Sequence, residues 1–188
     1  MLSDYHIILA SNSPRRKELL SGLGIHFEVR VIPGIDESYP STLMPSDVPC
    51  YIAQKKADAY PIKDNELIIT ADTVVILDHK ILEKPVDRED AINMLRQLSG
   101  QTHEVVTGVM ISTQERQTSF SVSSTVRFAT LTDEEITHYV DSFHPYDKAG
   151  AYGIQEWIGY IGVQEINGSF YNVMGLPVQR LYQELKQF

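Results

Sequence analysis

The stretch YHIILASNSPRRKELL, residues 5–20, sets the class of fold. Its first part, residues 5–10, is a short apolar run that predicts a buried strand. Ser13 and Pro14 follow as a typical N-cap and a typical first residue of a helix. A strand that passes directly into a helix is the unit from which α/β proteins are built, because the helix then covers one face of the sheet.

Strand and helix patterns go on alternating along the rest of the chain, which predicts an α/β fold with a mixed, β-rich centre. Asp87 with Asp90, and Thr132 with Glu135, resemble helix-capping pairs. Asn167-Gly168 between two apolar runs predicts the turn of a β-hairpin. Strands are expected at residues 27–32, 67–70, 74–77, 80–82, 103–112, 118–129, 157–166 and 169–173, and helices at 14–22, 46–60, 87–100, 132–140 and from 176 onward.

Length and composition limit the classes of protein that remain. The chain has 188 residues, which fits one domain or two small lobes that share a core. Its formal net charge of −9 disfavours nucleic acid and anionic membranes as partners, but basic residues that converge in one pocket can still bind a small anion. The single cysteine, Cys50, suits a reducing compartment. The N-terminal residues do not resemble a signal peptide and no stretch has transmembrane length, so a cytoplasmic location is expected.

The start of the first helix is a candidate phosphate site. A helix N-terminus offers unpaired N–H groups and the positive end of the helix dipole to an anion. Arg15, Arg16 and Lys17 are disfavoured there unless an anion compensates for the repulsion. The alternative is a solvated helix start with its charges in water. We prefer that alternative for Lys17, and phosphate binding for Arg15 and Arg16, because arginine makes bidentate contacts with phosphate oxygens.

Two acidic residues are candidates for metal binding or for activating water. Asp72 directly follows the expected strand 67–70, at the carboxyl end where the ligand clefts of α/β sheets open. A carboxylate there can bind a divalent cation or act as a general base. On pattern alone, an Asp that caps a turn is the commoner case. Glu37 is a possible second carboxylate, although by itself it is typical of an exposed loop.

Basic residues and glycines in later loops give weaker signals. Lys84 and Lys148 lie beside Pro or Gly in expected loops, and Lys55 with Lys56 fits the polar face of a helix, so surface lysines are the simplest interpretation. Residues 148–155 contain glycines that would let the backbone approach a ligand closely. The side chain of Gln155 carries both a donor and an acceptor, which suits the edge of a nucleobase. The alternative for this segment is a bulged strand or a tight turn.

Several familiar catalytic motifs are absent from the sequence. It has no Gly-x-x-x-x-Gly-Lys phosphate loop, no Cys-x-x-Cys, no His-x-x-x-His pair and no Gly-x-Ser-x-Gly elbow. His26 and His103 are isolated in the sequence and fit structural roles better than catalytic ones. Spacing alone therefore supports an α/β protein with a basic helix start, an acidic residue at a strand end and a glycine-rich loop, and goes no further.

Taken together and in order, these segments resemble the Maf family of nucleotide pyrophosphatases. The resemblance is carried by LASNSPRRKELL, ADTVV, EKP, LRQLSG, HEV, DKAGAYGIQ, INGS and VMGLP, at residues 9–20, 71–75, 83–85, 95–100, 103–105, 147–155, 166–169 and 173–177. Each segment is moderately specific, and the ordered set, which runs along nearly the whole chain, is highly specific.

The resemblance implies a single domain over residues 1–188 with the two-lobed Maf/ITPase-like α/β fold, a twisted mixed sheet and a central cleft. It also implies dependence on Mg²⁺ or Mn²⁺ and a possible homodimer. By position, Asp72 matches the family's general base, and Glu37 could share the metal ion with it. The matches to substrate-binding positions are Arg15, Thr73 and Gln155, which are tied to the choice of substrate, and Arg16, Lys84 and Lys148, which line the cleft.

The implied reaction is the attack of water on the α-phosphorus of dTTP or UTP, which gives the monophosphate and pyrophosphate in a house-cleaning role. Glu156-Trp157 departs from the glycine that many relatives have after Gly-Ile-Gln, and could reshape the pocket for the base. Two alternatives stay open: a regulator of cell division that binds nucleotides without turnover, and a pyrophosphatase that prefers 7-methyl-GTP or purines. An inosine-triphosphate-type enzyme shares the chemistry but not these motifs.

Overall fold

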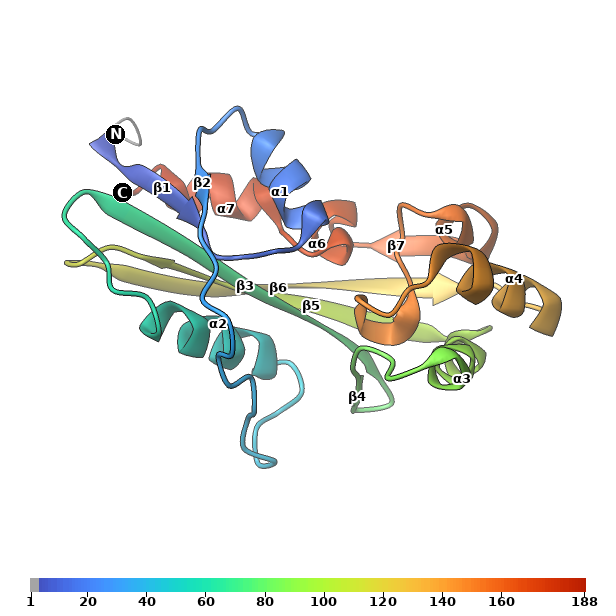
Figure 1. The fold of residues 1–188 in the computed structure, drawn as a ribbon. Helices are drawn as coiled ribbons and strands as arrows, with labels where there is room; N and C mark the ends of the chain where they lie inside the picture. The colour runs from blue at the N-terminus through green and yellow to red at the C-terminus, as the bar shows by residue number, and fades with distance from the viewer. Residues whose placement is uncertain (1–3) are drawn as a thin grey trace. The chain divides into compact units, whose positions relative to one another are not determined.

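The computed structural model describes residues 4–188; residues 1–3, on which the expected absence of a signal peptide partly rests, lie outside this range. Within it, seven strands form one mixed sheet in the order β2-β1-β3-β5-β6-β7, with β4 paired to β3 (Figure 1). The strands are β1 (His6–Leu9), β2 (Glu28–Val29), β3 (Glu66–Leu77), β4 (Lys80–Leu82), β5 (Thr102–Ser112), β6 (Gln117–Phe128) and β7 (Val163–Asn167).

Helices alternate with these strands, and the expected α/β class with a mixed sheet is confirmed. The helices are α1 (Pro14–Ser21), α2 (Val48–Asp58), α3 (Arg88–Leu98), α4 (Asp133–Phe143), α5 (Trp157–Gly162), α6 (Phe170–Met174), α7 (Val178–Leu185) and the short 3₁₀ helix η2 (Ala149–Ala151). No helix within residues 4–188 is long and apolar enough to cross a membrane.

The chain divides into two compact units. Unit 1 comprises the residues up to Thr73 together with Thr107–Val122 and Gly175–Phe188. Unit 2 comprises Val74–Val106 and Ser123–Met174. The strands β3, β5 and β6 contribute residues to both units.

In unit 1, β1 is the central strand of a parallel trio. It pairs with β2 through Ile8↔Glu28 and with β3 through the register that ends at Leu9↔Ile69. Helix α1 connects β1 to β2 and lies with α7 on one face of the sheet, whereas α2 connects β2 to β3 and lies on the other face (Figure 1). In α/β sheets, ligands generally bind beyond the carboxyl ends of the parallel strands.

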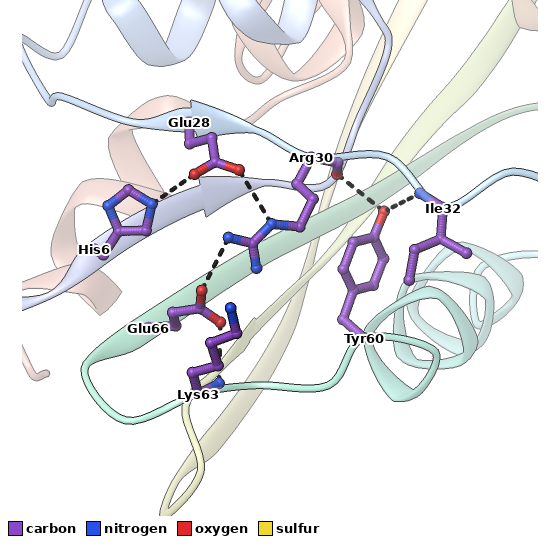
Figure 2. Close-up of polar contacts among 7 residues, drawn as sticks. All are labelled: His6, Glu28, Arg30, Ile32, Tyr60, Lys63 and Glu66. Atoms are coloured by element: carbon purple, nitrogen blue, oxygen red, sulfur yellow. Dashed lines mark hydrogen bonds and ion pairs between the residues drawn. The ribbon is translucent and has the colours of Figure 1, made fainter.

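A row of polar side chains ties the three parallel strands together at the other end of the trio (Figure 2). His6 and Arg30 both contact the carboxylate of Glu28, at 2.8 and 3.1 Å. Arg30 also donates to Glu66 at 2.9 Å, and this contact is the main cause of a lowered pKa for the buried Glu66 carboxyl. The hydroxyl of Tyr60 donates to the backbone carbonyl of Arg30, so the same row anchors the chain just after β2.

In unit 2, the helices α3 and α4 begin where the sequence predicts. The side chain of Asp87 accepts a hydrogen bond from the backbone N–H of Asp90 at 2.9 Å, which caps α3. Thr132 and Glu135 form the reciprocal capping box of α4. The starts of α3 and α4 could be predicted because each capping residue and its partner lie within one turn of the helix.

One expected strand end is absent. The sequence predicts separate strands at residues 67–70 and 74–77, with Asp72 in the loop between them. The structure has one continuous strand, β3, from Glu66 to Leu77, and Asp72 lies in its middle. The polar side chains that suggested a break have partners instead: Thr70 donates to the carbonyl of Ala53 at 2.6 Å, and Asp72 accepts from α2.

The expected hairpin around Asn167-Gly168 is wrong. Its first half contains α5 and the short β7, which pairs antiparallel with β6, and its second half is α6. Ile158 and Gly162 are buried four residues apart, as on one face of a helix. A Cβ atom at Gly159 would lie 1.8 Å from the carbonyl oxygen of Ile154, so this glycine allows the close approach of two segments. The expected strand 27–32 is likewise reduced to Glu28–Val29.

Candidate active site

The turn between β1 and α1 is built by two serines. The hydroxyl of Ser13 accepts from the backbone N–H of Arg16 at 3.4 Å and caps α1, as the sequence predicts. The hydroxyl of Ser11 accepts from the N–H of Ser13 at 3.2 Å, which fixes the approach to the helix. Pro14 takes the first helical position, where no N–H is needed. These contacts place Arg15 and Arg16 in the first turn, beside the carboxyl end of β1.

Arg16 points into unit 1 and binds protein groups. Its Nε donates to the carbonyl of Gly175 at 2.8 Å, one Nη to the carbonyl of Ala71 at 2.8 Å and the other to the hydroxyl of Thr73 at 3.1 Å. Burial lowers the pKa of Arg16 below its ordinary value, and the negative charge of Asp72 opposes this effect. A guanidinium has five N–H donors, so three of them are engaged within the protein.

The two candidate carboxylates face one ammonium group. The Nζ atom of Lys56 on α2 lies 3.0 Å from Oδ1 of Asp72 and 3.2 Å from Oε2 of Glu37. The side chains of Lys56 and Asp72 are each 14% exposed, whereas that of Glu37 is 50% exposed. The arrangement therefore joins a strand, a helix and a loop around a single positive charge.

Lys55 and Lys56 are not a solvated pair, contrary to the simplest interpretation of the sequence. Lys55 donates to the carboxylate of Asp36 and to the backbone carbonyl of Ser38, both at 2.8 Å. Hydrogen bonds from Lys55 and Ser38 hold the pKa of Asp36 well below its usual range. Together the two lysines tie the loop that carries Glu37 to α2.

Thr73 is the next residue of β3 and belongs to the same unit. Its hydroxyl accepts from Arg16 and shares a hydrogen bond of 2.8 Å with the hydroxyl of Thr107. The structure thus brings together four of the residues selected from the sequence, namely Arg16, Glu37, Asp72 and Thr73, and adds Lys56 to them.

In unit 2, Lys148 is buried in a network of its own. Its Nζ atom lies 2.9 Å from Asp147 and 3.1 Å from Glu156. The other carboxylate oxygen of Glu156 accepts a hydrogen bond from the hydroxyl of Tyr139, and that hydroxyl accepts from the backbone N–H of Gly153 at 3.0 Å. Glu156 is therefore linked through the hydroxyl of Tyr139 to the backbone of the glycine-rich segment.

Gln155 lies inside the segment that this network holds. Its Oε1 atom is buried and has no hydrogen-bond partner among the described residues. A Cβ atom at Gly153 would come within 3.0 Å of the side chains of Gln155, Glu156 and Lys148. A glycine at this position is thus what allows the three polar side chains to converge on the backbone.

Lys84 occupies the exposed loop between β4 and α3 and forms no ion pair with any residue of the described range. The neighbouring carbonyl of Glu83 accepts from the N–H of Gly150 at 3.1 Å, so this loop contacts the segment that follows Lys148. Within unit 2, the structure therefore gathers Lys148 and Gln155 in one segment and places the loop of Lys84 against it.

His103 has the structural setting that its isolation in the sequence suggests. It is buried, and its Nε2 atom shares a hydrogen bond of 2.7 Å with the hydroxyl of Tyr152. Burial lowers the pKa of His103 to about 4. Its ring also makes an edge contact with Phe128. His103 thus supports the glycine-rich segment through Tyr152 rather than offering a titrating group to a ligand.

In unit 1, two carboxylates, a largely buried lysine and the capped N-terminus of α1 thus lie near the carboxyl end of the parallel strand β1. The chain belongs to the Maf family, since the family description "Maf-like protein" matches residues 6–188. A protein of Bacteroides thetaiotaomicron named dTTP/UTP pyrophosphatase is 60% identical over 99% of this chain and 97% of its own length. One of the same name from Parabacteroides distasonis is 61% identical over 100% of this chain and 98% of its own length.

Among solved structures, a HAM1 protein from Coxiella burnetii matches 98% of this chain and 100% of its own chain, with a TM-score of 0.48 and 14% identity. A likeness of this size carries no functional information.

Proposed function

We propose that this protein is a nucleoside triphosphate pyrophosphatase that hydrolyses dTTP and UTP to the monophosphate and pyrophosphate. Membership of the Maf family and full-length relatives that bear this activity in their names support it. The observation that carries it is the convergence of Asp72 and Glu37 on one ammonium group, because the same pair of carboxylates can face a cation and a water beside a triphosphate.

In the reaction, water attacks the α-phosphorus and the bond to the bridging oxygen of pyrophosphate breaks. Asp72 orients this water and accepts a proton from it. Its position on a central strand gives it the rigid setting that a general base requires. The proton count balances because one water supplies the hydroxyl on the monophosphate, and the released proton passes through Asp72 to solvent.

The residues fit a hard divalent cation, Mg²⁺ or Mn²⁺. The donors are carboxylate oxygens, and Glu37 and Asp72 already lie near one positive charge. No group of three or more His, Cys, Asp or Glu side chains within residues 4–188 is arranged to hold a metal ion. Mg²⁺ usually takes only one or two carboxylates and completes its shell with water and substrate phosphates. When bound, such an ion neutralises charge on the phosphates and polarises the phosphorus.

Other residues of the chain bind the two ends of the substrate. Arg15, at the N-terminus of α1, and the lysines Lys84 and Lys148 neutralise the triphosphate. Gln155 and Thr73 take part in the choice of substrate. The Oε1 atom of Gln155 lacks an internal donor, and the imide N–H of thymine or uracil is a donor that matches it. A site with an unpaired acceptor rejects a base that cannot supply the donor.

The decisive experiment measures pyrophosphate release from dTTP, UTP, ATP, GTP and 7-methyl-GTP at matched concentrations. We expect the highest kcat/KM for dTTP and UTP. Asp72→Asn should keep the fold and most substrate affinity but lose turnover by about 10²–10⁴-fold, because it removes the proton acceptor. Asp58→Asn, on the exposed end of α2, is a matched control.

Each alternative corresponds to a distinct result. Tight binding of triphosphates without release of pyrophosphate would favour the regulator of cell division. Fastest turnover of 7-methyl-GTP or a purine nucleotide would refute the pyrimidine preference and leave the pyrophosphatase assignment standing. Full activity in a folded Asp72→Asn protein would refute the role of Asp72.

We also propose a cytoplasmic location, because free nucleoside triphosphates are held there. The homodimer that the family resemblance implies stays a prediction, which sedimentation velocity would test. The two-lobed single domain over residues 1–188 likewise stays a prediction.

A further inference from the structure

Between the residues that pair with β1 and those that pair with β4, a short stretch of β3 has no strand partner on that edge. The last paired residues are Leu9 and Ile69, and the N–H of Ala10 still donates to the carbonyl of Ile69 at 2.9 Å. Backbone carbonyls alternate in direction along a strand, so the carbonyl of Ala71 points to the same edge as that of Ile69. A buried carbonyl without a donor is costly, and here the donor is the side chain of Arg16 at 2.8 Å.

The same guanidinium binds on both sides of Asp72. It donates to the backbone of Ala71 before it and to the hydroxyl of Thr73 after it, while a third bond to the carbonyl of Gly175 fixes the guanidinium itself. Asp72 is therefore held between two residues that share one rigid, planar donor group.

Arg16 acts from the face of the sheet opposite to the carboxylate. Thr70 and Asp72 both contact α2, through Ala53 and Lys56, whereas Thr73 contacts α1. This alternation is the normal pleat of a strand. The guanidinium thus fixes the backbone on either side of Asp72. Three of its five N–H groups donate to Ala71, Thr73 and Gly175.

We propose that Arg16 is the positioning residue for Asp72 and is not chiefly a ligand of the triphosphate. The proposal rests on the proposed function, since it assigns to Arg16 the task of holding the general base in line with its water. An error of about 1 Å in such a position can cost on the order of 10²-fold in rate. A phosphate ligand would instead be reflected in the affinity for the triphosphate.

Arg16→Lys separates the two roles, because lysine keeps the charge but lacks the planar fork that reaches three separate acceptors. We expect kcat for dTTP to fall on the order of 10²-fold, while the Kd of a non-hydrolysable α,β-imido analogue of dTTP stays close to the wild-type value. Arg15→Lys and Arg15→Ala are the matched comparisons from the same helical turn, and Arg15→Ala should weaken binding of the analogue. A rise in Kd for Arg16→Lys with kcat retained would overturn the proposal.

A double-mutant cycle tests whether Arg16 acts through Asp72. If it does, Arg16→Lys added to Asp72→Asn should cause little further loss of kcat, because the group it positions has already been removed. Additive losses would overturn the proposal. Circular dichroism will show whether Arg16→Lys folds at the assay temperature. If it does not, Thr73→Val replaces it in the cycle, because this change removes the hydroxyl that accepts from Arg16. Thr73→Ser keeps that hydroxyl and should restore kcat. Failure of Thr73→Ser to restore it, or additivity in that cycle, would equally overturn the proposal.

The outcome stays distinguishable from failure of the proposed function. Absence of pyrophosphate release by the wild-type protein from every triphosphate would refute the function itself. Release by the wild type, with loss in Asp72→Asn but additive losses with Arg16→Lys, would refute only the positioning role.

Discussion

The buried imidazole of His103 should make the stability of unit 2 sensitive to acid. The side chain is 2% exposed, and its Nδ1 atom has no hydrogen-bond partner within the described residues. Burial lowers its pKa from 6.5 to about 4, so the folded protein holds it neutral at neutral pH. Protonation would place a charge and a second N–H donor in a site built around Phe128 and Tyr152.

The sign and size of the effect follow from linkage. Because the folded pKa is lower than the unfolded one, the stabilising contribution is complete above pH 6.5 and is lost as the pH falls toward 4. At about 1.4 kcal/mol for each pKa unit, the whole loss is about 3 kcal/mol. Between pH 7.5 and pH 5 the expected loss is about 2 kcal/mol, a large fraction of the stability of a small protein.

Urea unfolding at a series of pH values measures this loss. The single tryptophan, Trp157, lies in unit 2 and reports the transition by fluorescence, with circular dichroism as a second probe. His103→Gln can still hydrogen-bond to the hydroxyl of Tyr152 but cannot titrate. The other titrating groups are the same in both proteins, so their contributions to the pH dependence cancel in the comparison. The free energy of unfolding of the wild type should fall by about 2 kcal/mol more than that of the variant. Equal pH dependence in the two proteins would refute the reasoning, and Tyr152→Phe should keep the wild-type slope because burial is the cause.

Two further predictions concern the site. Dialysis against EDTA should abolish pyrophosphate release, and Mg²⁺ or Mn²⁺ should restore it, because the available ligands are hard oxygens; full turnover in the chelated protein would contradict this. Tyr139→Phe removes the hydroxyl that accepts from the Gly153 N–H and donates to Glu156, which should loosen the segment that carries Gln155. We therefore expect a smaller preference for dTTP over ATP, measured as the ratio of their kcat/KM values. The exposed Tyr146→Phe is its control, and an unchanged ratio in a folded Tyr139→Phe protein would count against the role of this network.

Local signals in the sequence were sufficient for the helix starts. Ser13, Asp87 and Thr132 each accept a hydrogen bond from a backbone N–H three residues later, so each cap and its partner are close neighbours in the sequence. The geometry of a cap depends on one turn of chain and not on the remainder of the fold. For this reason these elements begin where the sequence predicts them.

The continuity of β3 could not be predicted in the same way. Thr70 and Asp72 interrupt an apolar run, and a polar interruption usually marks a strand end. Their partners, Ala53 and Lys56, lie 17 and 16 residues earlier in the chain, on a helix whose packing is set by the fold as a whole. A polar residue in a central strand is tolerated once it is hydrogen-bonded.

Lys56 was missed although a usable signal was present. Ile52, Ala53 and Ala57 of α2 are buried. Lys56 lies four residues after the first of these and three after the second, so the helical period places it beside the buried stripe. A lysine at that position needs an acidic partner, because an unpaired buried ammonium is unfavourable. The pairing with Asp72 could therefore have been suspected, although not the identity of the partner.

The register of β1 against β3 ultimately determines which groups can meet at this site. Side chains alternate along a strand, so a shift of one residue would turn Thr73 toward α2 and Asp72 toward α1. The pairing of Leu9 with Ile69 prevents this, and the capped turn then delivers Arg16 to the carbonyl of Ala71. The carboxylate is left on the face where α2 presents a positive charge. The geometry of the site thus depends on a backbone register that is set by buried apolar residues.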